Sequence, residues 1–349
     1  MPDLRVTLGS LTLANPILAA AGTFGYGVEF SRAVRLERLG ALITKTLTLE
    51  ARAGHPPPRV VETPAGMLNA VGLQNIGLDA FLREKLPELR RHRVPVIVSL
   101  LGESVEELAG MSRTVDGADG VAAVELNLSC PNIQLGSGLG VGGSGQPRTP
   151  PARPGVLGRA NPPGPARRAG AGEARTLERR VSLVAHEPEA VAAMVAAARR
   201  ATRKPLLAKL SPDVTDVVPV ARAAERAGAN ALTIGNTFVG MSLDPATRRS
   251  RLGTATGGLS GPAIRPLAVY RVWYTANSVS LPIIGVGGIV RAEDAIEFFL
   301  AGASAIAVGT ANFADPATPL RVLEGVTRYL KRHRLQSLHE LRGAFRPDA

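Results

Sequence analysis

Short runs of hydrophobic residues recur along the chain, and an amphipathic segment follows most of them. Glycine, proline and polar residues bound the runs, as is typical of strands in a buried parallel sheet. The runs predict eight strands, at 16–22, 41–46, 94–100, 122–129, 205–211, 230–237, 281–288 and 303–310. The segments between them predict helices near 78–91, 103–114, 187–202, 216–227, 262–278, 291–301 and 316–332, with a weaker one near 29–38.

Eight strand–helix repeats favour an α/β fold of the (β/α)8 TIM-barrel type. An open, doubly wound sheet is the alternative that the same alternation allows. The length of 349 residues suits one such domain over 1–349. A low-complexity stretch rich in glycine, proline, alanine and arginine interrupts it at about 134–185, after the fourth strand. We expect this insertion to be disordered.

The net charge of +12 is unevenly distributed, because residues 134–185 hold eight arginines and two glutamates. The absence of basic runs interleaved with aromatic residues disfavours nucleic-acid binding. The single cysteine, Cys130, excludes an internal disulfide and a multi-cysteine metal centre, so we expect no metal site. The sequence shows no signal peptide and no apolar run of membrane-spanning length, and we expect a cytoplasmic protein.

Active sites of β/α barrels lie at the C-terminal ends of the strands, and here most of those ends carry polar residues or glycine. Lys45 and Lys209 predict an anionic ligand, because a buried lysine is costly without one; snorkelling into solvent is the alternative. Glycine turns after the last two strands are typical of a phosphate site, although glycine also serves in ordinary tight turns. These turns contain Gly287, Gly288, Gly309 and Thr310.

Amide side chains gather in the segment 66–77 and near the strand ends. They favour a planar, amide-rich ligand such as a pyrimidine, whereas a surface Ω-loop is the alternative for 66–77. Cys130 has no histidine near it in sequence, which disfavours a Cys–His hydrolase. A thiolate there can act as a general base toward a carbon acid, although a buried cysteine is usually a small hydrophobic residue. The amides are Asn69, Gln74, Asn75, Asn127, Asn132 and Asn236.

Six segments together resemble class 1 dihydroorotate dehydrogenases, over the whole chain except about 134–185. They read NLSCPN, MLNAVGLQN, KLSPDVTD, GGLSGPAIRP, PIIGVGGI and AGASAIAVGTANFADP. GLQN and GTANFADP are similar to class 1B, whose catalytic subunit works with an electron-transfer partner. The resemblance implies an FMN-containing barrel that oxidises dihydroorotate to orotate in de novo pyrimidine biosynthesis.

The resemblance also implies a role for each matching position, with Cys130 taking the C5 proton of dihydroorotate while a hydride leaves C6 for FMN. Implied substrate contacts are Lys45, Asn69, Ala70, Val71, Gly72, Leu73, Asn127, Asn132, Asn236 and Thr237. Implied FMN contacts are Ala21, Lys45, Thr46, Ser99, Asn127, Lys209, Gly235, Gly261, Gly287, Gly288, Gly309 and Thr310. A homodimer is expected, within a heterotetramer whose partner subunit carries FAD, a 2Fe–2S cluster and the NAD site.

The sequence departs from this family pattern at several positions. Ala21 stands where serine is frequent, Ser99 where asparagine is frequent, and Gly235 replaces an apolar residue, which we expect to loosen the packing. The insertion lies where the family has its mobile active-site lid, so activity depends on how the lid accommodates it. It is a surface extension, an interaction arm or a stretch of erroneous translation, since GC-rich codons encode the same residue types.

Three other functions remain open at this point. A dihydropyrimidine dehydrogenase-like flavin reductase shares the barrel, the flavin and the cysteine loop. A fumarate-dependent enzyme of the class 1A type needs no partner subunit. An inactive flavin- or RNA-binding relic would use the arginine-rich insertion as its working part.

Overall fold

The structure is a computed structural model that describes residues 2–129 and 184–347. Cys130, Asn132 and nearly all of the predicted insertion lie outside the described residues. The prediction of one domain over 1–349 therefore stays a prediction. Strand pairing joins the two described segments, because β8 pairs with β9.

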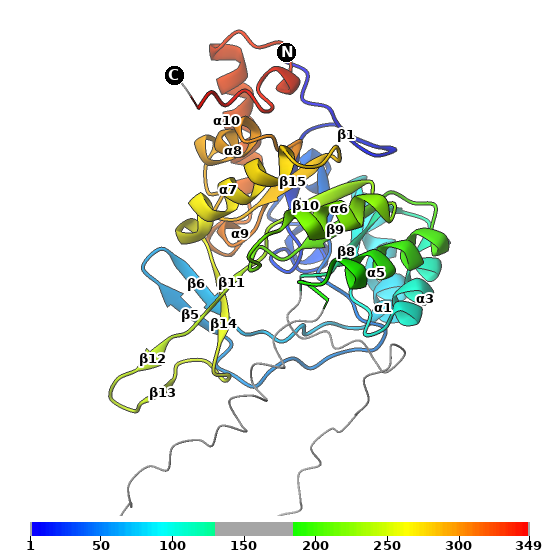
Figure 1. Ribbon diagram of the computed structural model, residues 1–349, viewed down its shortest axis with the longest axis vertical. Helices are drawn as coiled ribbons and strands as arrows, with labels where there is room; N and C mark the ends of the chain where they lie inside the picture. Colours follow the sequence, from blue (N-terminus) through cyan, green and yellow to red (C-terminus); the bar gives the residue numbers. More distant parts are fainter. Residues whose placement is uncertain (1, 130–183, 348–349) are drawn as a thin grey trace, which may run out of the picture.

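Eight parallel strands close into a barrel, as predicted (Figure 1). Each strand pairs in parallel with the next one along the chain, and the last pairs with the first. The closed order excludes the open sheet. Every strand is shorter than its hydrophobic run, because the run extends into the turn before the strand, after it, or both. The strands are β3 Ile17–Ala19, β4 Ala41–Ile43, β7 Val96–Leu100, β8 Val121–Asn127, β9 Leu206–Leu210, β10 Ala231–Ile234, β15 Ile283–Val286 and β16 Ala305–Val308.

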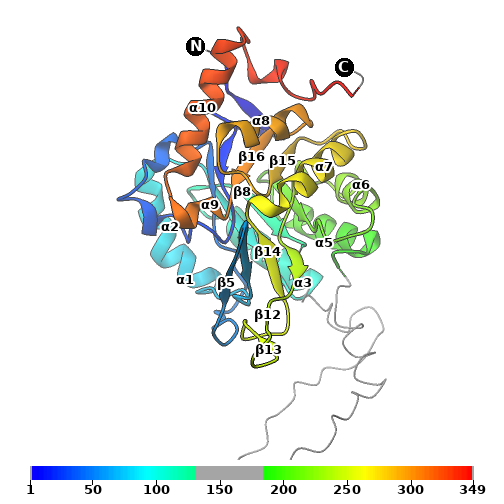
Figure 2. The same ribbon diagram turned by 90° about the vertical axis from the view of Figure 1, so that its left-hand side faces the viewer.

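Helices surround the barrel (Figures 1 and 2). The predicted helix near 78–91 is divided by short segments of wider and tighter turns, and the one near 262–278 begins with a single 3₁₀ turn. Within residues 2–129 and 184–347, no helix is long and apolar enough to cross a membrane. The main helices are α1 Leu78–Ala80, α2 Leu86–Leu89, α3 Val105–Asp116, α5 Pro188–Ala201, α6 Val218–Arg226, α7 Arg265–Ala276, α8 Ala292–Leu300, α9 Ala311–Ala314 and α10 Thr318–Arg332. The short segments are η1 Val28–Phe30, η2 Leu36–Arg38, η3 Phe81–Lys85, η4 Arg90–His92, η5 Pro262–Ile264 and η6 Leu338–Glu340.

The weaker helix predicted near 29–38 is wrong. The segment forms only the two 3₁₀ turns η1 and η2, and Arg35 between them has a ψ of 90°, outside the helical region. Val34 and Leu36 are both buried. In one continuous helix these two side chains would point about 200° apart, so the chain breaks its helix to bury both.

The barrel interior changes from apolar at one end to polar at the other. Near the amino ends of the strands, alternate side chains form an apolar cluster with Leu8 and Leu13. These two leucines come from the hairpin β1 Val6–Leu8 and β2 Leu11–Leu13, which closes this end. The same alternation continues along β8 from Ala123 to Glu125 and Asn127, so polar side chains line the interior near the carboxyl ends.

A four-stranded antiparallel sheet, absent from the sequence prediction, stands at the end of the molecule opposite β1 (Figure 1). Its middle strands are β6 and β14, which follow barrel strands β4 and β10 in the chain. Leu68 pairs with Leu259, so the pairing joins two connections that are distant in sequence. The strands are β5 Val60–Thr63, β6 Gly66–Asn69, β11 Phe238–Gly240 and β14 Gly257–Ser260, with the hairpin β12 Leu243–Asp244 and β13 Arg249–Ser250 beyond them.

Gly285 in β15 packs directly against Phe298 of α8. A Cβ atom at position 285 would lie 2.4 Å from Phe298 Cδ1, and Phe298 is fully buried. We predict that Gly285→Ala lowers the free energy of unfolding by about 1–3 kcal/mol, because the core is overpacked. Denaturant unfolding followed by circular dichroism measures the change.

Gly110 in α3 is the matched control, because a Cβ built there has no heavy atom within 4 Å outside its chain neighbours and the backbone of its own helix. Gly110→Ala is expected to raise the free energy of unfolding by about 0.5–1 kcal/mol, since glycine is costly in a helix interior. Changes of the same sign and size at both positions would contradict the packing argument.

Candidate functional site

The structure brings the predicted strand-end residues to one end of the barrel, here called the mouth. Parallel strands of a closed barrel have all their carboxyl ends at the same end, and each of the eight contributes. The mouth also lies next to the small antiparallel sheet, whose strands belong to connections that leave it. Its predicted members are Ala21, Lys45, Thr46, Ser99, Asn127, Lys209, Gly235, Gly287, Gly288, Gly309 and Thr310.

Three predicted residues on neighbouring strands are joined by hydrogen bonds. Asn127 Nδ2 donates to Thr46 Oγ1 at 3.1 Å, and the hydroxyls of Thr46 and Ser99 lie 3.0 Å apart. Asn127 and Thr46 are nearly buried and Ser99 is fully buried. The asparagine amide therefore has a fixed orientation, with its nitrogen toward β4.

Asn236 is connected to this group through a residue that the sequence analysis did not single out. Ser129 Oγ donates to Asn127 Oδ1 at 2.7 Å and accepts a hydrogen bond from Asn236 Nδ2. Thr237 follows, and its backbone N–H donates to Asn236 Oδ1 at 2.8 Å. The structure thus brings the amides of strands β8 and β10 together across β9.

Lys209 is only 6% exposed. It lies in β9 beside Asn127 of β8 and Thr233 of β10. Among residues 2–129 and 184–347, no side chain or backbone group forms a hydrogen bond or an ion pair with its ammonium. A buried ammonium is costly without an anion or polar partner, so its position favours an anionic or electron-rich ligand at the mouth.

Lys45 follows β4 and is partly buried. Burial lowers the pKa of Lys45, and the positive charge of Arg59 lowers it further. Arg59 was not recognised from the sequence, and its guanidinium donates to Gln74 Oε1 at 2.8 Å and to the backbone oxygen of Ala53 at 3.0 Å. The two cations make this side of the mouth electropositive.

The glycine turns after β15 and β16 differ in whether the surrounding chain leaves room for a side chain. Gly288 has a φ of 72°, and a Cβ there would lie 2.9 Å from the backbone nitrogen of Arg265, so the chain itself demands glycine. At Gly309 a Cβ would meet only Ala20 and Thr23, both at an ordinary 3.9 Å. An atom over Gly309 would therefore clash with none of the described residues, which agrees with a phosphate site there.

The predicted substrate segment 66–77 is partly a strand and partly a loop. Asn69 ends β6 and donates from Nδ2 to the backbone oxygen of Gly258 at 3.2 Å. Leu73 has a φ of 56°, which non-glycine residues rarely adopt. Ala70, Val71 and Gly72 lie between them. The Ω-loop alternative is wrong for residues 66–69, because these form β6.

Asn75 holds this loop in place and is not an open amide of the mouth. It is buried, and its side chain forms four hydrogen bonds within the described residues: Oδ1 accepts from the backbone N–H groups of Thr48 and Gly77, while Nδ2 donates to Thr48 Oγ1 and the backbone oxygen of Leu73. Those bonds tie the strained Leu73 to the segment that follows β4.

Gly235 and Gly261 are positions where two parts of the backbone approach closely. A Cβ at Gly235 would lie 2.1 Å from the backbone oxygen of Val286, and one at Gly261 would lie 2.6 Å from Gly66 Cα. The expectation that Gly235 loosens the packing is therefore wrong, because here glycine permits a close contact between neighbouring strand ends. Ala21 has no side-chain hydroxyl, and the hydroxyl of Ser99 is bonded to Thr46 and Glu125.

Glu125 is the second buried group that the sequence analysis missed. It lies in β8 two residues before Asn127, and its side chain is fully buried inside the barrel. Ser99 Oγ donates to Oε1 at 3.2 Å, and Thr233 Oγ1 donates to Oε2 at 2.9 Å. The alternation of β8 could have placed Glu125 on the same face as Asn127, although its partners come from other strands.

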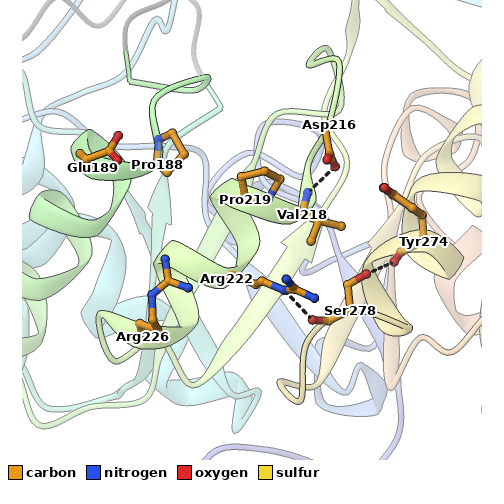
Figure 3. A pocket seen from close by; sticks show the side chains of 9 residues that line it. All are labelled: Pro188, Glu189, Asp216, Val218, Pro219, Arg222, Arg226, Tyr274 and Ser278. Atoms are coloured by element: carbon orange, nitrogen blue, oxygen red, sulfur yellow. Dashed lines mark hydrogen bonds between the residues drawn. The ribbon is translucent and has the colours of Figure 1, made fainter.

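A separate groove of about 590 Å³ lies on the outside of the barrel, between α5, α6 and α7 (Figure 3). Arg222 donates from Nε to the backbone oxygen of Ser278 at 3.2 Å, and Val218 N–H donates to Asp216 Oδ1 at 2.9 Å. None of the predicted site residues lines it. We place the candidate site at the mouth, where the buried charges and oriented amides lie.

Comparison with known proteins agrees with this arrangement. The family model "Dihydroorotate dehydrogenase" matches residues 3–142 and 180–330. The chain belongs to the dihydroorotate dehydrogenase family. The gap between the two matched segments, 143–179, falls within the predicted insertion.

Several proteins that are similar to this chain over nearly its full length bear the name "Dihydroorotate dehydrogenase B (NAD(+)), catalytic subunit". The one from Geotalea daltonii is 44% identical over 345 residues, covering 99% of each chain. The one from Trichlorobacter lovleyi is 44% identical over 343 residues and 98% of each chain. The one from Thermodesulfovibrio yellowstonii is 41% identical over 347 residues, or 99% of this chain and 100% of its own. The resemblance to class 1B dihydroorotate dehydrogenases is confirmed.

Asn75→Ala tests how this family member holds its substrate loop. We predict a loss of about 2 kcal/mol or more in the free energy of unfolding, because two buried backbone N–H groups lose their acceptor. Denaturant unfolding of the flavin-free protein measures it. The control is Asn277→Ala on the exposed end of α7, whose single side-chain hydrogen bond goes to Trp273, and we expect a change within about 0.5 kcal/mol. Equal losses would contradict the role of Asn75.

Lys45→Met tests the cost of placing this ammonium at the mouth. Because burial lowers the pKa of Lys45 below its ordinary 10.5, the unfolded chain holds this proton more tightly than the folded chain. Wild-type stability therefore rises with pH between the lowered pKa and 10.5, and the full penalty is present below that window.

We accordingly expect flavin-free Lys45→Met to be more stable than wild type at neutral pH, with a difference that shrinks as the pH approaches 10.5. Unfolding by urea across a pH series measures the difference. A difference that does not change with pH would show that Lys45 carries no such penalty.

Proposed function

We propose that this protein oxidises dihydroorotate to orotate in de novo pyrimidine biosynthesis, with FMN bound at the mouth of the barrel. Family membership and the names of the relatives support the reaction. The observation that carries the proposal is Lys209, a nearly buried ammonium without a partner among the described residues, beside the oriented amide of Asn127. A flavin and a pyrimidine both present the carbonyl oxygens that such donors bind.

The donor set of the mouth fits FMN. Gly287, Gly288, Gly309 and Thr310 would hold the phosphate, and the open space over Gly309 agrees with this role. Ala21, Thr46, Ser99, Gly235 and Gly261 would border the flavin. Lys209 would hold positive charge against the ring, where a preorganised cation stabilises negative charge. When bound, FMN accepts the hydride that leaves substrate C6.

The remaining donors would bind the substrate. Lys45 supplies an ammonium that burial makes costly until an anion neutralises it, and the carboxylate of dihydroorotate is such an anion. Amides from two sides of the mouth would contact the pyrimidine ring, and the loop after β6 would cover it. These further residues are Asn69, Ala70, Val71, Gly72, Leu73, Asn127, Asn132, Asn236 and Thr237.

Cys130 would remove the C5 proton of dihydroorotate as the C6 hydride departs, which leaves the C5–C6 double bond of orotate. It lies outside the described residues, but it directly follows Ser129, whose hydroxyl is bonded to Asn127. A thiolate is a competent general base near neutral pH. The adjacency of Cys130 to Ser129 in the chain supports its assignment as the base.

The electrons would leave through a partner subunit carrying FAD and a 2Fe–2S cluster, and reduce NAD. The relatives are named as catalytic subunits of an NAD(+)-linked enzyme, which supports a heterotetramer built on a homodimer of this chain. The single cysteine of the chain supports an iron–sulfur cluster on another subunit.

An absorbance spectrum of the purified protein, recorded without oxygen before and after addition of dihydroorotate, tests the cofactor and the half-reaction together. We expect a flavin band that bleaches on addition. Bleaching by dihydrouracil instead would favour the dihydropyrimidine dehydrogenase-like reductase, and turnover with fumarate alone would favour the class 1A type. A colourless protein would overturn the proposal.

Cys130→Ser tests the base. We expect FMN to stay bound, while the rate of flavin bleaching by dihydroorotate at pH 7 falls by about 10²-fold or more, because a hydroxyl is a poorer base. Stopped-flow absorbance measures the rate. Ser112→Ala, which removes a buried hydroxyl from α3, serves as the control. A wild-type rate for Cys130→Ser would remove the assignment.

A further inference from the structure

Glu125 is a buried acid to which the proposed reaction assigns no role. Its side chain has no exposed surface. Both of its oxygens accept hydrogen bonds from hydroxyls, one from Ser99 of β7 and one from Thr233 of β10. Strand β9 separates β8 from β10, so the bond to Thr233 crosses the inside of the barrel. With two hydrogen-bond partners, the buried carboxyl group of Glu125 has its hydrogen-bonding capacity met, so it is stable in the barrel interior and its function must be sought in what its partners do.

In the series of hydrogen bonds that ends at Glu125, every group donates toward Glu125 and accepts from the next group along. Because Ser99 donates its only hydroxyl proton to Glu125 Oε1, it can only accept from Thr46, whose Oγ1 lies 3.0 Å away. Thr46 therefore donates its hydroxyl proton to Ser99 and can only accept a hydrogen bond from its other neighbour. That neighbour is Asn127, which must present its NH₂ group at 3.1 Å.

The same direction continues past Asn127 to the next strand. With its nitrogen used toward Thr46, Asn127 turns Oδ1 toward Ser129, which donates to it at 2.7 Å. Ser129 then accepts from the NH₂ group of Asn236. The acceptor Glu125 thus determines where the NH₂ group and the oxygen of each amide point. Both amides, Asn127 and Asn236, are proposed ligand contacts.

We propose that Glu125 is a positioning residue of the mouth: as the terminal acceptor of this series, it sets the amide orientation of Asn127 and Asn236 and, through Asn127, which is among the implied FMN contacts, the affinity for FMN. This inference rests on the proposed function, because it assumes that FMN binds there. Lys209 stands on the adjacent strand beside Asn127, two residues beyond Glu125 along β8, so the oriented amide lies next to the lysine proposed to face the flavin.

The test measures the dissociation constant of FMN, by quenching of its fluorescence on titration with the flavin-free full-length protein. Glu125→Met removes the acceptor at similar length, and Ser99→Ala removes the next link. Each is expected to weaken FMN binding about tenfold or more, because a misoriented amide leaves a buried hydrogen-bonding group unsatisfied at the ligand. The double variant is expected to bind no more weakly than the weaker single variant, because both changes break one series.

Glu125→Gln is the conservative variant, since its amide oxygen can still accept from Ser99 while its NH₂ group faces Thr233. We expect it to restore FMN affinity to within about threefold of wild type, well short of the loss expected from removing the acceptor, and to restore the shape of the flavin absorption band. A purely structural role would lower the stability of Glu125→Met without changing FMN affinity per folded molecule. Ser112→Ala controls for loss of a buried hydroxyl elsewhere.

Additive losses in the double variant, wild-type affinity of Glu125→Met, or a Glu125→Gln as weak as Glu125→Met would each overturn the inference. If Glu125→Met does not fold, Thr46→Val combined with Ser99→Ala replaces it, and non-additive losses are again expected. Wild-type protein that binds no FMN would instead overturn the proposed function, so the two failures are distinguishable.

Discussion

The parallel register of the eight barrel strands brings their carboxyl ends to one mouth, and every feature of the candidate site depends on it. Because the strands are short, the side chains at and just beyond their ends converge from all sides of the barrel. Lys209, Asn127 and Thr233 lie side by side only because β8, β9 and β10 pair in this register. A shift of one residue would turn these side chains out toward the helices.

The polar groups inside the barrel are tolerated because they satisfy one another. Glu125 would be costly in an apolar barrel, yet it accepts from two hydroxyls, and the same hydroxyl series reaches the amides at the mouth. Below it the interior is apolar and closed by the N-terminal hairpin. The barrel therefore combines a stabilising core at one end with a preorganised polar surface at the other, and the transition occurs within three residues of β8.

The small antiparallel sheet extends the site beyond the barrel. It pairs β6 with β14, so the loop that bears the proposed substrate contacts is anchored to a connection almost 190 positions later, as the bond from Asn69 to Gly258 shows. Asn75 anchors the other end of the loop at Thr48. With both ends held, the loop can keep Leu73 in a strained conformation.

The sequence by itself determined the eight strands, the barrel, the family and the strand-end residues, because hydrophobic runs and motifs are local signals. Tertiary structure alone decided the features that depend on contacts between distant segments. These are the small sheet and the four hydrogen bonds that occupy the Asn75 side chain. They also include the close approach of Gly235 to Val286 and the position of the Arg59 charge near Lys45. The helix predicted near 29–38 failed for the same reason, since burial of Val34 and Leu36 against distant residues outweighed local helical preference. Glu125 shows the limit most clearly: its position was readable in the sequence, but its hydroxyl partners come from β7 and β10, which only the closed barrel brings to it.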